Sequence, residues 1–312
     1  MKGRRIFVAG HKGMVGSAIT RRLHSLGAEV LIVERSDVDL LRQQAIESWL
    51  DQNRPDTVVL AAAKVGGIFA NDAFPADFLY QNLAIETNVI HAAHLAGIDR
   101  LVFLGSSCIY PKFAPQPIKE DALLSGALEP TNQWYAIAKI AGIKLCESYR
   151  RQFGRRYISI MPCNLYGPND NFDLLSSHVL PALIRKVHTA KEQGASEVIV
   201  WGTGTPRREF LHVDDLARAV AFCMDRYDDS EPINCGAGRD VSIRELAEIV
   251  ADTIGFRGRL RFDASKPDGT PKKLMDSSRL AALGWKPEIE LSDGVADAYR
   301  WFSRHCAEVA EA

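Results

Sequence analysis

Short apolar runs alternate with helix-like segments over the first half of the chain. The runs are rich in Val, Ile, Leu and Phe, which is typical of strands buried on both faces of a sheet. They read RRIFVAG, AEVLIVE, DTVVLAAA, RLVFLGS and RYISIMP. Helical patterns lie between them at Met14–Leu26, Gln43–Gln52, Pro75–Ala96 and Asn132–Phe153. This alternation predicts an α/β fold in which βαβ units build a doubly wound parallel sheet.

The pattern loosens after the segment NLYGPND. Proline and glycine return in WGTGTPRREF and DASKPDGTPKK, with short helical patterns between them, such as Ser242–Ile254. One later apolar run, EPINCGAG, is typical of a strand that returns to the main sheet. We therefore expect a smaller C-terminal lobe that closes over the carboxyl edge of the sheet.

Composition narrows the classes of protein that fit. The 312 residues are 46% hydrophobic and 25% charged, which is ordinary for a globular protein. Lys and Arg number 38 against 39 Asp and Glu, so the net charge of −1 gives no support to a nucleic-acid or membrane partner. The six cysteines form no C-x-x-C pair, which indicates reduced thiols and no metal site. With no secretory signal pattern, the sequence predicts a cytoplasmic protein.

A glycine loop follows the first predicted strand and opens the first helix. Gly10, Gly13 and Gly16 stand in FVAGHKGMVGSAI with the spacing G-x-x-G-x-x-G. Glycines at such a turn let the backbone approach a pyrophosphate, which then lies at the helix N-terminus. Met14 and Val15 begin the same helix, and we expect them to contribute. The loop predicts a Rossmann-type dinucleotide-binding fold.

These elements suggest a division of the chain into two parts. Residues 1–170 form the expected dinucleotide-binding domain, to which 211–236 return. Residues 171–210 and 237–312 form the expected substrate-binding lobe.

The residues near the second predicted strand bear on which dinucleotide binds. Glu34 stands where NAD enzymes hold the ribose 2′-hydroxyl, but Arg35 follows it and Lys12 lies in the glycine loop. Two cations suit a 2′-phosphate better than a hydroxyl. We therefore expect NADP(H), with Lys12 and Arg35 as its phosphate clamp; the alternative for either cation is an ordinary solvated surface charge.

A tyrosine and a lysine stand four residues apart in the helical pattern QWYAIAKIAG. This spacing places Tyr135 and Lys139 on one helix face. A lysine cation favours the phenolate, so it is expected to lower the tyrosine pKa toward the working range. Ser106, at the end of the fourth predicted strand, could hydrogen-bond the substrate oxygen that Tyr135 protonates. Ser106 and Ser107 could also be turn or helix-cap hydroxyls.

Several longer phrases make a resemblance specific. They are VAGHKGMVGSAI, AAAKVGGI, LGSSCIYPK, EPTNQWYAIAKIAGIKLCESY, NLYGP, SHVLPALIRK, WGTGTPRREFLHVDD and FDASKPDGTPKKL. Along essentially the whole chain, the sequence resembles the extended short-chain dehydrogenase/reductase family that acts on nucleotide sugars.

The resemblance implies an NADP(H)-dependent enzyme with a GDP-sugar substrate. Such an enzyme inverts the carbons on either side of a C4 ketone and then reduces the ketone. Cys108 matches the family's base for the inversion, and His178 matches the acid on the opposite face of the sugar. The alternatives are structural roles, in which Cys108 packs in the core and His178 caps a helix.

The resemblance also implies contacts and an assembly. Lys139, Asn164 and His178 are expected on the cofactor side. The expected substrate contacts are Lys186, Trp201, Arg208 and Lys273. The helices at 75–96 and 132–153 pair across a two-fold axis in the family, which implies a homodimer.

Other activities remain open from the sequence. A sister enzyme could act on the related GDP-4-keto sugar of colitose formation, where one carbon is inverted. A 4-epimerase or 4,6-dehydratase fits less well, because SCIYP lacks the acidic pair that follows the serine in the dehydratases. A non-catalytic redox sensor on a dinucleotide-binding fold would usually lose the tyrosine–lysine pair, which this chain keeps.

Overall fold

The apolar runs of the first half form a sheet of six strands in the order β2-β1-β3-β4-β5-β9. The computed structural model describes residues 1–174, 176–266 and 268–311. The strands are β1 (Arg5–Ala9), β2 (Glu29–Leu31), β3 (Thr57–Leu60), β4 (Arg100–Leu104), β5 (Arg156–Pro162) and β9 (Ile233–Cys235). All neighbouring pairs are parallel. The predicted return of EPINCGAG is confirmed, because β9 pairs with β5.

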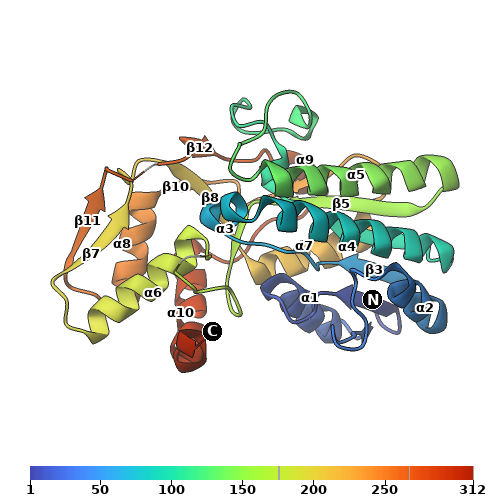
Figure 1. Cartoon of the computed structure of the whole chain (residues 1–312), viewed down its shortest axis with the longest axis horizontal. Helices are drawn as coiled ribbons and strands as arrows, with labels where there is room; N and C mark the ends of the chain where they lie inside the picture. The colour runs from blue at the N-terminus through green and yellow to red at the C-terminus, as the bar shows by residue number, and fades with distance from the viewer. Residues whose placement is uncertain (175, 267, 312) are drawn as a thin grey trace.

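Helices cover both faces of this sheet, as the doubly wound prediction requires (Figure 1). α4 and α5 pack together on one face with α2 against α4, and α1 and α7 pack together on the other. The bounds are α1 (Met14–Ser25), α2 (Gln43–Asn53), α4 (Pro75–Leu95), α5 (Gln133–Phe153) and α7 (Val213–Arg226). The four predicted helices of the first half are thus confirmed.

Local signals set several helix ends. α4 begins with Pro75, whose missing N–H costs nothing at a first helical position. α5 ends at Gly154, which adopts the left-handed conformation at φ 69°. α8 (Ile243–Ile254) begins with a capping box in which Ser242 and Glu245 satisfy each other's backbone N–H groups.

A second core lies in the smaller lobe. α6 (Val179–Glu192), α8 and α10 (Leu291–Glu311) belong to this lobe with the parallel pair of strands β7 (Glu197–Trp201) and β11 (Arg259–Asp263) (Figure 1). Leu183, Val198 and Leu246 are among its buried side chains.

A small sheet joins the two cores. β8 (Arg207–His212) pairs with β6 (Asn164–Tyr166), β10 (Asp240–Ser242) and β12 (Lys272–Lys273). The shorter elements are α3 (Ile68–Ala73), η1 (Ser107–Ile109), η2 (Glu120–Ala122) and α9 (Ser278–Ala282).

One segment differs from the expected division of the chain. The expected division puts residues 237–312 in the smaller lobe. Met275, Leu280 and Trp285 instead pack in the larger core, because α9 lies against β9.

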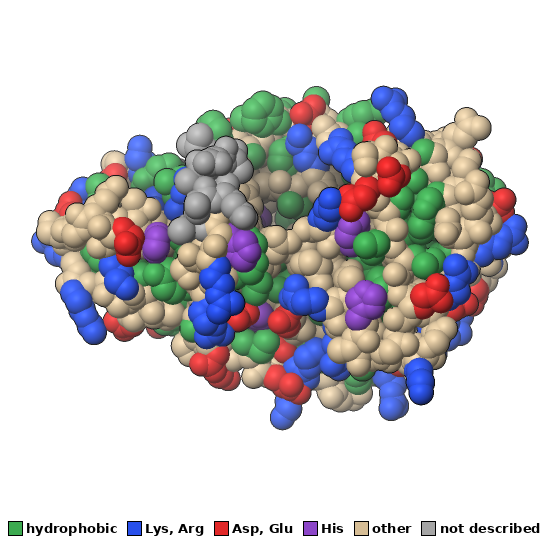
Figure 2. Space-filling view, turned by 90° about the horizontal axis from the view of Figure 1, so that it is seen from below, with side chains coloured by type: hydrophobic (Ala, Val, Ile, Leu, Met, Phe, Trp, Pro, Cys, Tyr) green, Lys and Arg blue, Asp and Glu red, His purple; other side chains and the backbone are tan. Residues whose placement is uncertain are grey.

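The surface in Figure 2 mixes Lys and Arg with Asp and Glu. Within the described residues, no helix is both long and apolar enough to cross a membrane. Five cysteines are free and buried, while the side chain of Cys306 lies outside the described part.

Candidate active site

A cavity of about 2130 Å³ lies along the carboxyl edge of the main sheet, between the sheet and the smaller lobe. From β1, the chain first adds β2 on one side and then β3 on the other. Ligands of open α/β sheets bind at such a switch in strand order, at the carboxyl ends of the strands. Every site residue predicted from the sequence lines this cavity. They are Gly10, Lys12, Gly13, Met14, Val15, Gly16, Arg35, Ser106, Cys108, Tyr135, Lys139, Asn164, His178, Lys186, Trp201, Arg208 and Lys273.

The glycine loop has the geometry that a dinucleotide needs. Gly10 has φ 88°, and a Cβ there would lie 2.7 Å from the Ala62 backbone. A Cβ at Gly16 would collide with the Gly10 carbonyl oxygen. Gly13 precedes α1 and offers no side-chain cap, so the first N–H groups of the helix are left for a ligand. These groups fit the phosphates of a dinucleotide.

At the far end of this loop, Lys12 contacts a carboxylate. Its Nζ lies 2.5 Å from Glu34 Oε2, and His11 Nε2 lies 3.5 Å from Glu34 Oε1. The hydrogen bond from Lys12 lowers the pKa of Glu34. Arg35 is exposed, and it forms no ion pair among the described residues. The structure therefore brings Lys12 to Glu34, and the predicted clamp of Lys12 and Arg35 stays a prediction.

Tyr135 and Lys139 lie on the same face of α5. Lys139 Nζ lies 5.7 Å from the centre of the Tyr135 ring. The ammonium donates to the Leu104 carbonyl oxygen at 3.0 Å and lies 3.0 Å from Glu86 Oε1. The lysine is thus fixed by β4 and by a buried carboxylate on α4.

The expected lowering of the tyrosine pKa is not what the structure gives. Burial raises the pKa of Tyr135, and the charges of Cys108 and Glu86 act in the same direction. The largest cause is the burial of the phenol, to which the two neighbouring negative charges add. Burial also raises the pKa of Glu86 to about 7, although the Lys139 cation opposes this.

The GSSC segment turns into the cavity directly after β4. Ser106 caps η1, and its Oγ accepts a hydrogen bond from the Cys108 N–H at 3.4 Å. Ser106 therefore has the cap role that sequence analysis left open, and it also lines the cavity. Ser107 is buried in the same turn.

Cys108 lies in a buried position among charged groups. Burial raises the pKa of its thiol, while the Lys273 cation and the Ser106 hydrogen bond act to lower it.

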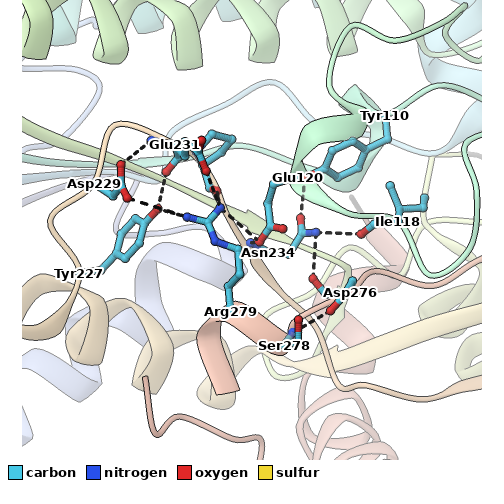
Figure 3. Close-up of polar contacts among 11 residues, drawn as sticks. Tyr110, Ile118, Glu120, Tyr227, Asp229, Glu231, Asn234, Asp276, Ser278 and Arg279 are labelled. Atoms are coloured by element: carbon cyan, nitrogen blue, oxygen red, sulfur yellow. Dashed lines mark hydrogen bonds and ion pairs between the residues drawn. The ribbon is translucent and has the colours of Figure 1, made fainter. Parts of the chain in front are cut away.

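A polar network holds this segment to the main sheet (Figure 3). Tyr110, two residues after Cys108, donates to Asn234 Oδ1 on β9 at 2.6 Å. Asn234 Nδ2 donates to the Ile118 carbonyl at 3.0 Å and the Asp276 carbonyl at 3.1 Å. Glu120 accepts from the Asn234 N–H at 3.0 Å. The network fixes η1 and the segment after β12 relative to each other.

His178 reaches the cavity from the smaller lobe. It stands at the N-terminal boundary of α6, but its side chain makes no capping hydrogen bond. The ring is open to the cavity yet surrounded by protein atoms, and this desolvation lowers its pKa. The preceding loop is held by a hydrogen bond of 2.7 Å from the Gly67 N–H to the Ser176 carbonyl oxygen.

Cationic side chains gather at the lobe end of the cavity. Arg208 and Lys273 stand opposite each other in the β8–β12 pair. Burial lowers the pKa of Lys273, as does the neighbouring Arg208, while the Cys108 charge opposes both. Lys186 Nζ lies 4.7 Å from the centre of the Trp201 ring. An anion bound here would relieve the repulsion between Arg208 and Lys273.

Asn164 has a structural contact in addition to its place in the cavity. Its Nδ2 donates to the Glu209 carbonyl oxygen at 2.8 Å, which links β6 to β8.

Some residues that shape the site are not predicted by any of the sequence patterns above. Glu86 is the most important, and the signal was a carboxylate on the buried face of α4, one turn from buried Asn82. Asp268 also lines the cavity and accepts from the Thr203 N–H at 2.7 Å and from its hydroxyl at 2.8 Å. Asn169 donates to the Lys12 carbonyl at 2.6 Å, but no sequence pattern pointed to this contact.

The parallel sheet, the glycine loop and the tyrosine–lysine pair define a nicotinamide-dinucleotide enzyme. The chain belongs to the NAD dependent epimerase/dehydratase family, whose sequence model matches residues 6–236. It uses a nicotinamide dinucleotide cofactor, as that family does.

Comparison with individual proteins points to one branch of the family. GDP-L-fucose synthase 1 of Arabidopsis thaliana is 60% identical over 97% of this chain and 94% of its own length. GDP-L-fucose synthase of Escherichia coli K12 is 56% identical over 97% of each chain. The crystal structure of a GDP-L-fucose synthetase from Naegleria fowleri bound to NADP superposes with a TM-score of 0.90 at 27% identity, covering 98% of this chain and 96% of that one. A GDP-L-colitose synthase is a more distant relative at 38% identity over 96% of this chain.

Proposed function

We propose that this protein catalyses the NADPH-dependent 3,5-epimerisation and 4-reduction of GDP-4-keto-6-deoxy-D-mannose to GDP-L-fucose. One observation supports this most directly. A single cavity is lined by a thiol and an imidazole from opposite parts of the molecule and by the Ser106, Tyr135 and Lys139 set. The first pair suits inversion and the second set suits reduction. The full-length identity to GDP-L-fucose synthases supports the same activity.

The inversion uses the acidity of hydrogens next to a ketone. Cys108 removes the proton, and His178 returns one to the opposite face of the same carbon. The hydroxyl groups of Ser106 and Tyr135 stabilise the enolate oxygen in between. The buried thiol needs a cation to become a thiolate, and Lys273 supplies the strongest positive charge acting on it.

The reduction follows at the same ketone. The cofactor, when bound, supplies the hydride. Tyr135 donates a proton to the ketone oxygen, and Ser106 holds that oxygen in place. Lys139 orients the cofactor and acts on the phenol through its charge. Lys139 and Cys108 are both almost fully buried, so their charges act in surroundings that are poor in water.

We assign the cofactor as NADPH. Lys12 and Arg35 would contact the 2′-phosphate, in competition with Glu34 for Lys12. The glycine-loop residues would bind the pyrophosphate, and Lys139, Asn164 and His178 would contact the nicotinamide half. The NADP-bound relative from Naegleria fowleri supports this choice.

We assign the GDP diphosphate to the cationic end of the cavity. Arg208 and Lys273 would bind its oxygens, with Lys186 and Trp201 beside them. The division into a dinucleotide-binding domain and a substrate lobe stays part of this proposal.

We also propose a homodimer formed through α4 and α5. Both helices leave large apolar side chains exposed, which a partner would cover. They are Tyr80, Leu95, Trp134, Ile137 and Phe153.

The product tests the function. Purified protein, NADPH and GDP-4-keto-6-deoxy-D-mannose are expected to give GDP-L-fucose, identified by NMR from the configurations at C3, C4 and C5. A product inverted at one carbon would favour the colitose-type activity. Absence of NADPH oxidation with any GDP-4-keto sugar would favour the sensor.

A further inference from the structure

A buried carboxylate lies beneath the tyrosine–lysine pair. Glu86 on α4 is 1% exposed, and Lys139 on α5 is 2% exposed. Glu86 Oε1 lies 3.0 Å from Lys139 Nζ. Neither oxygen of Glu86 has a hydrogen-bond partner among the described residues. Glu86 has no role in the reaction steps described so far. A buried ion pair is also a weak source of stability, because removing both charges from water can cost more free energy than their attraction returns.

The fold makes room for this carboxylate. At Gly142 on α5, a Cβ would lie 2.8 Å from Glu86 Oε2 and would collide with the Phe103 ring. A glycine in mid-helix destabilises the helix relative to alanine. Here it allows α4 and α5 to enclose the carboxylate next to Lys139.

The carboxylate also limits where the ammonium can point. An ammonium has three N–H donors. One reaches the Leu104 carbonyl oxygen, while Glu86 holds the ammonium through an ion pair that lacks hydrogen-bond geometry. At least one donor then remains for a ligand in the cavity.

The charge of Glu86 reaches the reacting phenol. From α5, the titratable groups that feel Glu86 are Lys139, Tyr135 and Cys146. From β4, the Phe103 ring and the Leu104 carbonyl contact Lys139. Burial raises the pKa of Glu86 to about 7, so its charge changes near neutrality.

We propose that Glu86 is a positioning residue of the reduction step, holding the Lys139 ammonium under Tyr135 and offsetting part of the positive charge that acts on the phenol. When Glu86 is ionised, the pair is neutral and the phenol keeps its proton. Without the negative charge of Glu86, the Lys139 charge would be unopposed and the pKa of the phenol would be lower. The inference rests on the proposed function for the role of Tyr135, but its central test needs no sugar.

The test replaces the carboxylate with its neutral isostere. Glu86→Gln keeps an oxygen beside Lys139 and removes the negative charge. The ultraviolet absorbance of each protein is followed against pH. The titration of the Tyr135 phenol is then the difference between that protein and its counterpart carrying Tyr135→Phe. We expect its midpoint to fall by about one pH unit in Glu86→Gln, as one charge removed at short range produces. The alkaline limb of kcat/KM for reduction is expected to move the same way.

The control is Glu29→Gln, which neutralises an exposed carboxylate paired with Arg5 on the main sheet. Its phenolate midpoint is expected to match the unmodified protein. An unchanged midpoint in Glu86→Gln would overturn the inference, whatever the sugar assay gives. If Glu86→Gln does not fold, Glu86→Asp withdraws the carboxylate by one methylene, and a smaller shift in the same direction is expected. No shift in the aspartate variant would then overturn it.

Discussion

Lys12 Nζ lies 2.5 Å from Glu34 Oε2, so the glycine loop and the segment after β2 meet through an ion pair at the wall of the cavity. Two residues that sequence reasoning assigned to opposite cofactor preferences are therefore in contact. A 2′-phosphate bound here would have to share Lys12 with the Glu34 carboxylate or displace that carboxylate from it.

This relationship gives a prediction for cofactor choice. We expect kcat/KM to be higher with NADPH than with NADH, and Arg35→Ala to narrow that ratio. A phosphate–cation contact contributes roughly 1.5–3 kcal/mol, or about 10- to 100-fold. Arg42→Ala, an exposed arginine outside the cavity, is the control. Equal use of both cofactors by the unmodified protein would contradict the assignment.

The second prediction separates inversion from reduction. Cys108→Ser is expected to fold and bind NADPH, because the volume barely changes. It is expected to slow solvent-deuterium exchange at the carbons flanking the ketone by about 10²- to 10⁴-fold, since a hydroxyl is far less acidic than a thiol. Cys223→Ser changes a buried cysteine outside the cavity and is expected to leave exchange intact. Exchange at the unmodified rate in Cys108→Ser would make the thiol a packing residue.

The third prediction is that reduction can be lost while inversion is retained. Tyr135→Phe removes the proton donor of the reduction but leaves Cys108 and His178 in place. We expect NADPH oxidation to fall by about 10²-fold or more, while deuterium exchange at the same carbons remains measurable. Loss of both reactions to the same extent would contradict separate roles for the two sets of residues.

The fourth prediction concerns assembly. Light scattering at micromolar protein is expected to give a dimer, and Leu95→Glu to give a monomer by placing a charge in the proposed α4–α5 interface. Leu283→Glu alters another exposed leucine, outside these helices, and is expected to leave the dimer intact. A monomeric unmodified protein would rule out the dimer.

The fifth prediction concerns pH and stability. Burial raises the pKa of Asp170 to about 7. The folded state then holds a proton that the unfolded state has lost, so this group lowers the free energy of unfolding as pH rises from about 4 to 7. Asp170→Asn is expected to remove that decline and to raise the free energy of unfolding at pH 8 by up to about 4 kcal/mol, because the shift is about three pKa units. Urea unfolding at several pH values between about 4 and 8 measures the free energy of unfolding. Asp99→Asn, which changes an exposed carboxylate, is the control. If Asp170→Asn leaves the pH dependence of this free energy unchanged, the raised pKa of Asp170 is contradicted.

The sequence by itself determined the central sheet and much of the cavity lining, because their signals are local. Buried parallel strands need continuous apolar runs, and the glycine loop must follow the first of them. Tyr135 and Lys139 share a face because a helix repeats every 3.6 residues. Cys108 and His178 came from resemblance, since no local pattern joins them.

Tertiary structure decided how charges are paired inside the site. Glu86 meets Lys139 because α4 packs on α5, and Lys12 meets Glu34 because β1 lies beside β2. Asn234 reaches Tyr110 because β9 returns to the sheet after more than a hundred residues. Met275, Leu280 and Trp285 pack in the larger core because α9 lies against the same strand. Electrostatic interactions depend on distance in space and on burial, neither of which the order of residues along the chain contains.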